Sequence, residues 1–156
     1  MKHSEKALNL FMSGYNCSQS VFAAFCDVIR LDEPTALKIS LGLGGGIGRM
    51  REVCGTISAG SMILGAVYGG EGSTDKKTAY EKTREFAEKF REIHGSVICR
   101  ELLMLTVKME PSANPDERNA EYYAKRPCAR LVVDACEILD AILAEKSQPK
   151  KVDKIL

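Results

Sequence analysis

Residues 41–60 read LGLGGGIGRMREVCGTISAG, a glycine-rich run that becomes charged and then reaches a single cysteine, Cys54. Glycine loses more backbone entropy on folding than any other residue, so a dense run indicates a local need for positive φ or for close backbone approach. Five glycines fall within seven residues: Gly42, Gly44, Gly45, Gly46 and Gly48. The question is therefore whether this loop binds a phosphate, binds a cofactor or positions the cysteine that follows it.

Three interpretations of this glycine loop stay open. A phosphate-binding loop normally follows a strand and opens a helix within a βαβ unit, and that context is missing around residues 42–48. A flexible connector is the second interpretation. The third, which we favour, is that the glycines let the backbone fold tightly around Cys54 and expose its sulfur to other cysteines or to a cofactor. The backbone groups expected to contact a bound cofactor are those of Gly44, Gly45, Gly46 and Gly55.

Other titratable side chains add little to this picture. Arg49 and Arg51 lie in the loop, where a cation could lower the pKa of a nearby thiol. His3 and His94 lie near predicted helix ends in charged surroundings. We expect all four side chains to be solvated.

Length and composition are those of an ordinary globular domain. The chain has 156 residues, of which 45% are hydrophobic and 28% charged, so it is long enough to bury a core in one domain. The formal net charge is +1. A nucleic-acid-binding surface normally shows as a basic excess, so we expect no nucleic-acid partner.

The sequence favours a cytoplasmic protein without membrane insertion. Its first residues contain no continuous apolar region with a small-residue cleavage site. The longest weakly polar run, residues 56–70, is short for a membrane span and rich in glycine, alanine and serine. In the cytoplasm, six cysteines are more typical of core residues, metal ligands or redox thiols than of a disulfide framework.

Hydrophobic periodicity is helical along most of the chain, and it predicts an all-α, single-domain bundle of about five to seven helices over residues 1–146. The clearest amphipathic pattern covers residues 75–93, with Gly95 as its C-cap. The other helices are expected at about 7–15, 17–30, 35–41, 52–68, 97–104 and 128–146. A long loop with room for one helical turn at 117–124 is expected at 106–127, and a loosely attached tail at 147–156.

None of the six cysteines forms a CxxC pair, so the local signatures of zinc ribbons and thioredoxin-type sites are absent. Helix geometry also excludes two pairs. Cys17 and Cys26 would lie on opposite faces of a straight helix and about 13 Å apart along its axis. Cys128 and Cys136 would lie about 12 Å apart. Neither pair can share a metal or a disulfide without a break in its helix.

Position within the predicted helices separates the cysteines into two groups. Cys26 and Cys136 fall in mid-helix on apolar stripes, where free cysteine packs as a small hydrophobic residue. The N-terminus of a helix stabilises a thiolate through its unpaired N–H groups and its dipole. That is the chemistry of a nucleophilic thiol or of a metal ligand, with core packing as the alternative. The cysteines expected in first turns are Cys17, Cys54, Cys99 and Cys128.

Four segments resemble the redox-active protein family named for its CGCAxxGCC motif, whose members are small proteins of about this length. The segments are NCSQS (16–20), LGLGGGIGRMREVCG (41–55), FAEKFREIHGSVICRELL (86–103) and CARLVVDACEIL (128–139). The cysteines that match the family pattern are the four expected in first turns. In one departure, Thr56 stands where the family usually has alanine, and Ala59 and Gly60 follow.

The resemblance implies a redox protein in which the four thiols converge. They would bind a [2Fe–2S] cluster or zinc, or two of them would cycle between dithiol and disulfide, with a redox partner protein. Two other functions stay open: a helical partner-binding module with structural cysteines, and an enzyme that holds an anionic cofactor in the glycine loop. A monomer and a homodimer fit the pattern equally. Catalytic and metal-ligating roles fall on the same residues, Cys17, Cys54, Cys99 and Cys128.

Overall fold

The computed structural model describes residues 1–72, 76–104 and 112–147. Within these ranges the chain is helical and has no strand, which confirms the predicted all-α class. Six of the helices have eight residues or more, and three are shorter. In chain order they are α1 (His3–Met12), α2 (Cys17–Ala24), α3 (Cys26–Ile29), α4 (Glu33–Ser40), α5 (Gly55–Tyr68), α6 (Lys77–His94), α7 (Cys99–Leu102), α8 (Ala120–Lys125) and α9 (Cys128–Lys146), with the 3₁₀-helix η1 (Leu41–Leu43) after α4.

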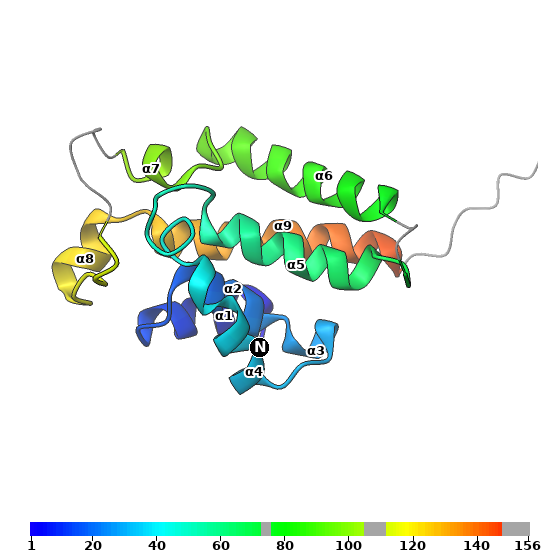
Figure 1. Cartoon of the computed structure of the whole chain (residues 1–156), viewed down its shortest axis with the longest axis horizontal. Coiled ribbons are helices and arrows are strands. Elements are labelled where there is room, and N and C mark those ends of the chain that lie inside the picture. Colours follow the sequence, from blue (N-terminus) through cyan, green and yellow to red (C-terminus); the bar gives the residue numbers. More distant parts are fainter. Residues whose placement is uncertain (73–75, 105–111, 148–156) are drawn as a thin grey trace, which may run out of the picture.

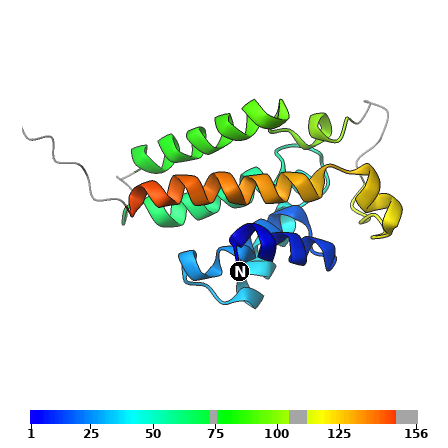
Figure 2. The same ribbon diagram turned by 180° about the vertical axis from the view of Figure 1, so that it is seen from behind.

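The helices are arranged in three layers (Figure 1). Helices α5 and α9 run side by side in the middle, α6 covers one side of this pair, and α1 to α4 cover the other, as the view from behind also shows (Figure 2). The short helices α7 and α8 lie at one end of the bundle, near the loop that precedes α5. The largest fully buried side chains between the layers are Phe11, Phe25, Phe86, Phe90, Ile63, Leu64, Leu139 and Ile142.

Side-chain caps fix the beginnings of three helices. Asn16 caps α2 by accepting a hydrogen bond from the Gln19 N–H at 2.9 Å, while the Gln19 side chain accepts one from the Asn16 N–H at 3.1 Å. Asp32 caps α4 through the Thr35 N–H, and Asn119 caps α8. Each cap supplies an acceptor to a backbone donor that the helix leaves unpaired.

One predicted helix is divided into two. The sequence predicts a single helix over residues 17–30, but the chain breaks at Phe25 into α2 and α3. The Phe25 N–H bonds to the carbonyl of Phe22, the tighter spacing of a 3₁₀ turn. Its ring is completely buried and stacks on His3 with the ring centroids 4.0 Å apart. The break thus follows from a contact with α1, which periodicity within the segment does not report.

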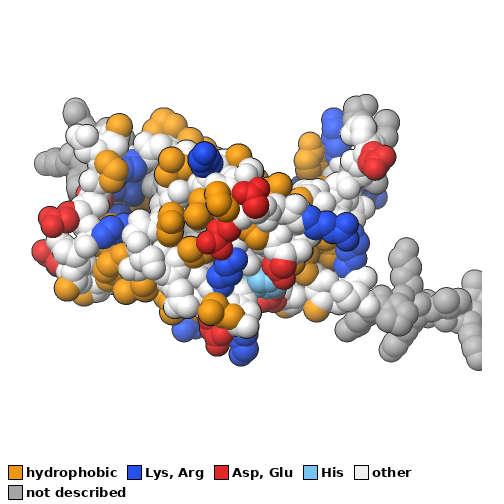
Figure 3. Space-filling view, turned by 90° about the horizontal axis from the view of Figure 1, so that it is seen from below, with side chains coloured by type: hydrophobic (Ala, Val, Ile, Leu, Met, Phe, Trp, Pro, Cys, Tyr) orange, Lys and Arg blue, Asp and Glu red, His pale blue; other side chains and the backbone are white. Residues whose placement is uncertain are grey.

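The surface and the chain ends complete the description. On the face seen from below in Figure 1, acidic and basic side chains are interspersed with hydrophobic ones (Figure 3). Of the helices in the described ranges, none combines the length and the apolar character needed to span a membrane. The predicted tail at 147–156 lies outside the described residues except for Ser147, as does the 106–111 part of the predicted long loop.

The two histidines are largely buried beside carboxylates rather than solvated, contrary to the prediction. His3 Nδ1 lies 2.6 Å from Asp140 Oδ1 and its Nε2 lies 3.1 Å from Asp27 Oδ1. His94 Nε2 lies 3.1 Å from Asp134 Oδ2 but makes no hydrogen bond within the described residues. Burial disfavours the charged His3 ring, but its hydrogen bonds to Asp140 and Asp27 outweigh this effect and raise the His3 pKa above 6.5. His3 on α1 therefore links α3 to α9.

We expect this link to make stability depend on pH. Because the folded-state pKa of His3 is raised, its contribution is complete below pH 6.5 and is lost as the pH rises through the folded value. His3→Gln should therefore lower the free energy of urea unfolding by about 1 kcal/mol more at pH 5.5 than at pH 9. Asp140→Asn should reduce the same pH dependence while leaving the His3 ring on Phe25. A loss on His3→Gln that is equal at both pH values would contradict this account.

Candidate functional site

A pocket with a volume of about 290 Å³ lies at the end of the bundle where α2, α5, α7 and α9 begin. Cys26 and Cys136 lie outside it, in the hydrophobic core. The pocket wall is partly apolar, with Phe11, Leu102 and Tyr122 among its residues. The cysteines that line the pocket are Cys17, Cys54, Cys99 and Cys128.

Helix beginnings bring these four cysteines to the pocket. Cys17, Cys99 and Cys128 are the first residues of α2, α7 and α9, and Cys54 is the N-cap residue of α5. The sequence predicts that α5 begins near residue 52, but residues 52 and 53 are extended. A side chain at a helix beginning sits next to N–H groups that have no partner within the helix. The four sulfurs thus lie at helix beginnings, where backbone N–H groups are free to bond to partners outside the helix.

Residues 52–54 are extended because they pair with the segment before α7. The Cys54 N–H donates to the Val97 carbonyl at 2.8 Å, and the Cys99 N–H donates to the Glu52 carbonyl at 2.6 Å. Val53 and Ile98 form an isolated antiparallel bridge between these bonds. This short pairing holds Cys54 and Cys99 at fixed positions on the pocket wall.

The glycine loop makes a turn in the left-handed region. Gly45, Gly46 and Gly48 have φ values of 64°, 71° and 52°, and Ile47 and Arg49 between and after them also have positive φ. Backbone bonds close the turn across five or six residues, such as that from the Gly48 N–H to the Gly42 carbonyl at 2.8 Å. The requirement for positive φ that the glycines indicate is therefore met.

This turn packs against Cys17 and Cys99. The N–H groups of Gly45, Gly55 and Ser18 donate hydrogen bonds to the Cys17 sulfur. A Cβ atom on Gly46 would lie only 2.7 Å from Cys99 Cβ, and one on Gly55 only 2.5 Å from Cys17 Sγ. Cys54 lines the same pocket as Gly44, Gly45 and Gly48, and that the glycines serve Cys54 itself stays a prediction.

Of the four glycines predicted to contact a cofactor, two line the pocket and two pack against cysteines. Gly44 and Gly45 line the pocket, whereas Gly46 and Gly55 lie behind the sulfurs of Cys99 and Cys17. Gly44 packs so closely on Asn16 that an added Cβ would lie 2.2 Å from the amide nitrogen of that side chain. These glycines position cysteines and the α2 cap, and two of them also expose backbone to the pocket.

Cys17 and Cys54 shift each other's pKa in opposite directions. The Cys54 thiol donates a hydrogen bond to the Cys17 sulfur, and this bond, helped by three backbone donors and opposed by burial, lowers the pKa of Cys17 from 9.0 to about 6. The same bond, with burial, raises the pKa of Cys54 well above 9.0. Thr56 Oγ1 lies 3.1 Å from the Cys54 sulfur. One thiolate and one thiol therefore share this end of the pocket at neutral pH.

The other two pocket cysteines keep their protons. Burial raises the pKa of Cys99, although the Arg51 guanidinium, 3.7 Å from the Cys99 sulfur, opposes this effect. Burial and then the negative charge on Cys17 raise the pKa of Cys128 to about 12. Among the pocket cysteines, Cys17 is therefore the one whose pKa is lowered and whose thiolate form is favoured.

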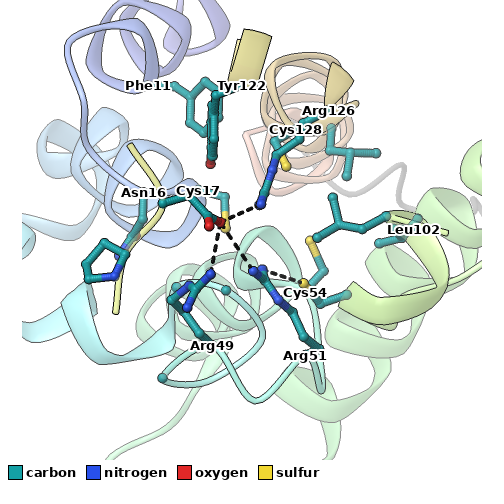
Figure 4. Close-up of a pocket in the computed structure, with 18 of the residues that line it drawn as sticks. Phe11, Asn16, Cys17, Arg49, Arg51, Cys54, Leu102, Tyr122, Arg126 and Cys128 are labelled. Atoms are coloured by element: carbon teal, nitrogen blue, oxygen red, sulfur yellow. Dashed lines mark hydrogen bonds and ion pairs between the residues drawn. The ribbon is translucent and has the colours of Figure 1, made fainter. Parts of the chain in front are cut away.

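The loop arginines are not solvated as predicted, because they point into the pocket (Figure 4). The side chains of Arg49 and Arg51 are only 20% and 13% exposed. With Arg126 they converge on one carboxylate, that of Asp116: Arg49 Nη2 lies 2.9 Å and Arg51 Nη2 3.6 Å from Asp116 Oδ2. The three guanidinium groups lower the Asp116 pKa, against the effect of burial.

Part of the pocket comes from residues 112–127, where the sequence predicts a loop and no site residue. The helical turn expected at 117–124 is present as α8. The arginines and tyrosines that precede Cys128 are a sequence signal for this part of the site. The pocket residues from this region are Ala113, Pro115, Asp116, Arg118, Tyr122 and Arg126.

Four cysteine sulfurs are a suitable donor set for zinc or an iron–sulfur cluster. In the described part of the chain, however, no three His, Cys, Asp or Glu side chains are grouped closely enough to hold a metal ion. The donor chemistry fits such a group and the side-chain arrangement does not. Binding would require the sulfurs to move closer together.

The close approach of Gly55 to Cys17 can be tested with one added methyl group. Gly55→Ala should displace the Cys17 sulfur, raise its pKa and slow its alkylation by iodoacetamide at pH 5, where the thiolate fraction falls on the order of tenfold per pKa unit. Gly65→Ala, in the same helix with open space at its Cβ position, is the matched control. It should stabilise the protein by about 1 kcal/mol and leave alkylation unchanged. Equal alkylation of Cys17 in both variants would disprove the contact.

The hydrogen bond from Cys54 predicts a difference between two conservative substitutions. Cys54→Ser keeps a donor at this position and should leave the Cys17 pKa low, whereas Cys54→Ala should raise it. The pH dependence of Cys17 alkylation, followed by peptide mass spectrometry, gives both values. If serine and alanine shift the pKa equally, the bond is not the cause of the low value.

A family model described as "Putative redox-active protein (C_GCAxxG_C_C)" matches residues 15–142, which include all four pocket cysteines. No curated protein and no solved structure matches the chain. The match covers 128 of the 156 residues. The chain therefore belongs to the C_GCAxxG_C_C family of redox-active proteins.

Proposed function

We propose that Cys17 and Cys54 form a two-electron thiol–disulfide couple, with Cys17 as the attacking sulfur. The observation that carries this proposal is that both sulfurs line one pocket, with Cys17 half-buried against the backbone of Gly55. The interaction with Cys54 is also the largest cause that lowers the Cys17 pKa. Formation of a disulfide requires the two sulfurs to approach to about 2 Å.

Cys17 has the properties of an attacking thiol. The thiolate is the nucleophilic form, and a pKa near the ambient pH combines a high thiolate fraction with good nucleophilicity. The pKa of Cys17 is lowered into that range by the interaction with Cys54 and by the N–H groups of Gly45, Gly55 and Ser18. It is half-buried and faces the pocket, so a small disulfide can reach it.

Cys54 has the properties of the second, resolving thiol. It is 5% exposed, and the hydrogen bond to Cys17 is the largest cause of its high pKa. Once Cys17 is bonded to another sulfur it is no longer an anion. The hydrogen bond to the Cys17 anion is then lost, and the pKa of Cys54 falls. Cys54 thus becomes a better nucleophile at the stage when it is needed.

The proposed reaction has two steps. The Cys17 thiolate attacks one sulfur of a disulfide R–S–S–R′, which forms the Cys17–S–S–R mixed disulfide and releases R′S⁻. Cys54 then loses its proton and attacks the Cys17 sulfur, which forms the Cys17–Cys54 disulfide and releases RS⁻. The protein loses two electrons and the proton of Cys54, and one disulfide becomes two thiolates, which take up protons according to the pH. The reverse sequence reduces the protein.

The test is equilibration of the reduced protein in glutathione buffers of graded redox ratio, followed by alkylation and peptide mapping. We expect reversible loss of two hydrogens with a single midpoint and a cross-link between the peptides of Cys17 and Cys54. Cys17→Ser and Cys54→Ser should each abolish it. Cys26→Ser, which alters a core cysteine outside the pocket, should leave it unchanged. A reversible cross-link that joins other cysteines would refute the assignment.

A four-cysteine metal or cluster site is the second candidate, and it is favoured by the position of all four thiols on one pocket. It predicts iron with sulfide, or zinc, in stoichiometric amount after anaerobic purification. The visible spectrum and metal analysis distinguish this from a metal-free dithiol. Stoichiometric metal that is lost on Cys17→Ser, Cys54→Ser, Cys99→Ser or Cys128→Ser would replace the dithiol couple as the function.

A further inference from the structure

The pocket next to Cys17 carries a strong excess of positive charge. Among the described residues that line it there are four arginines and one carboxylate, that of Asp116. The four arginines are Arg49, Arg51, Arg118 and Arg126. Positive charges around a partly enclosed cavity raise the local concentration of anions and their rate of entry. The charge balance of the pocket therefore favours an anionic ligand, although the chain as a whole is nearly neutral at +1.

Asp116 occupies the position that a ligand carboxylate would take. Its Oδ2 atom accepts hydrogen bonds from Arg49 and Arg126, and Arg51 lies 3.6 Å away. Figure 4 shows these bonds meeting at one point in the pocket. Guanidinium groups match carboxylates in geometry and can bind two oxygens at once. Asp116 lies outside the helices, and its side chain is 40% exposed, so a competing carboxylate has access to the same arginines.

Arg118 adds a donor that the described part of the chain does not satisfy. Its Nη1 atom is buried and has no hydrogen-bond partner there. The guanidinium group is held in place by the rings of Phe11 and Tyr122, whose centroids lie 4.8 and 4.4 Å away. Its Nη2 atom donates to the carbonyl of Tyr15. A buried donor without a partner is rare in folded proteins, and this one lies at the pocket wall.

The rest of the wall suits a short aliphatic chain. Leu41, Leu102 and Leu131 line the pocket together with the aromatic rings. The volume of about 290 Å³ lies at the lower end of the range for small-molecule sites. The pocket thus combines an arginine group, a short apolar wall and the Cys17 sulfur, and its size favours a small molecule over a peptide.

We propose that the substrates of the Cys17–Cys54 couple are small organic disulfides and thiols that carry a carboxylate. The carboxylate binds Arg49, Arg51 and Arg126 in place of Asp116, and the aliphatic part lies against the leucines. The disulfide is then directed at Cys17. This inference rests on the proposed function, since the disulfide is the oxidant in the two steps given above.

Three disulfides with similar size and different charge test the inference: dithiodiglycolate (anionic), bis(2-hydroxyethyl) disulfide (neutral) and cystamine (cationic). Stopped-flow measurement gives the rate at which each oxidises the reduced protein. Division by its rate with free 2-mercaptoethanol removes intrinsic reactivity. We expect a normalised rate at least tenfold higher for the anionic disulfide than for the neutral one, the lowest rate for the cationic one, and a smaller preference at high salt.

Substitutions make the test specific to the arginine group. Arg126→Gln should reduce the preference for the anionic disulfide severalfold, whereas Arg84→Gln, the same change on the exposed face of α6 outside the pocket, should not. Asp116→Asn should increase the rate with the anionic disulfide because it removes the competing carboxylate. If Asp116 served only to brace the loop, this change would lower all three rates alike and would contradict its stand-in role.

The remaining outcomes separate the two proposals. Equal normalised rates for the three disulfides, with the Cys17–Cys54 disulfide as product, would overturn the substrate class and leave the couple intact. Failure of all three to produce that disulfide would overturn the couple, and the substrate class with it.

Discussion

The site depends on one close approach between two helix beginnings, that of Gly55 on α5 and Cys17 on α2. A methyl group on Gly55 would lie 2.5 Å from the Cys17 sulfur, so only glycine lets the backbone N–H reach it. Two helices then direct their positive ends at the same atom. Helix α2 is itself buried along nearly its whole length, from Ser18 to Ala24. The core therefore fixes the sulfur, and the sulfur's hydrogen bonds need no movement to form.

Features set by local periodicity or local capping could be predicted from the sequence, and features set by contacts between distant segments could not. Helices α6 and α9 follow from their amphipathic patterns, and the all-α class follows with them. The glycines of the loop predict positive φ values there. The cysteines that the loop contacts are set by pairing between distant segments, such as that of Val53 with Ile98. Asp116 could not be predicted as a partner of three arginines, because its segment has no periodicity that would place it.

Strain in the glycine loop points to its role. Ile47, Arg49 and Arg51 have φ values of 63°, 62° and 61°, although none is a glycine. A left-handed conformation costs a non-glycine residue roughly 1–2 kcal/mol. Such residues persist where the surroundings determine their conformation, and they cluster at functional sites. Here two of the three carry the guanidinium groups that meet at Asp116.

The hydrogen bonds to the Cys17 thiolate have a consequence for redox poise. They stabilise the reduced protein, and a disulfide sulfur, which carries no charge, would gain much less from the same N–H groups. A couple whose reduced form is selectively stabilised has a higher reduction potential and acts as a stronger oxidant. For the proposed couple, the donors on Gly45, Gly55 and Ser18 therefore set the direction of electron flow as well as the reactivity of the sulfur. The close approach of Gly55 to Cys17 thus also influences the reduction potential of the proposed couple.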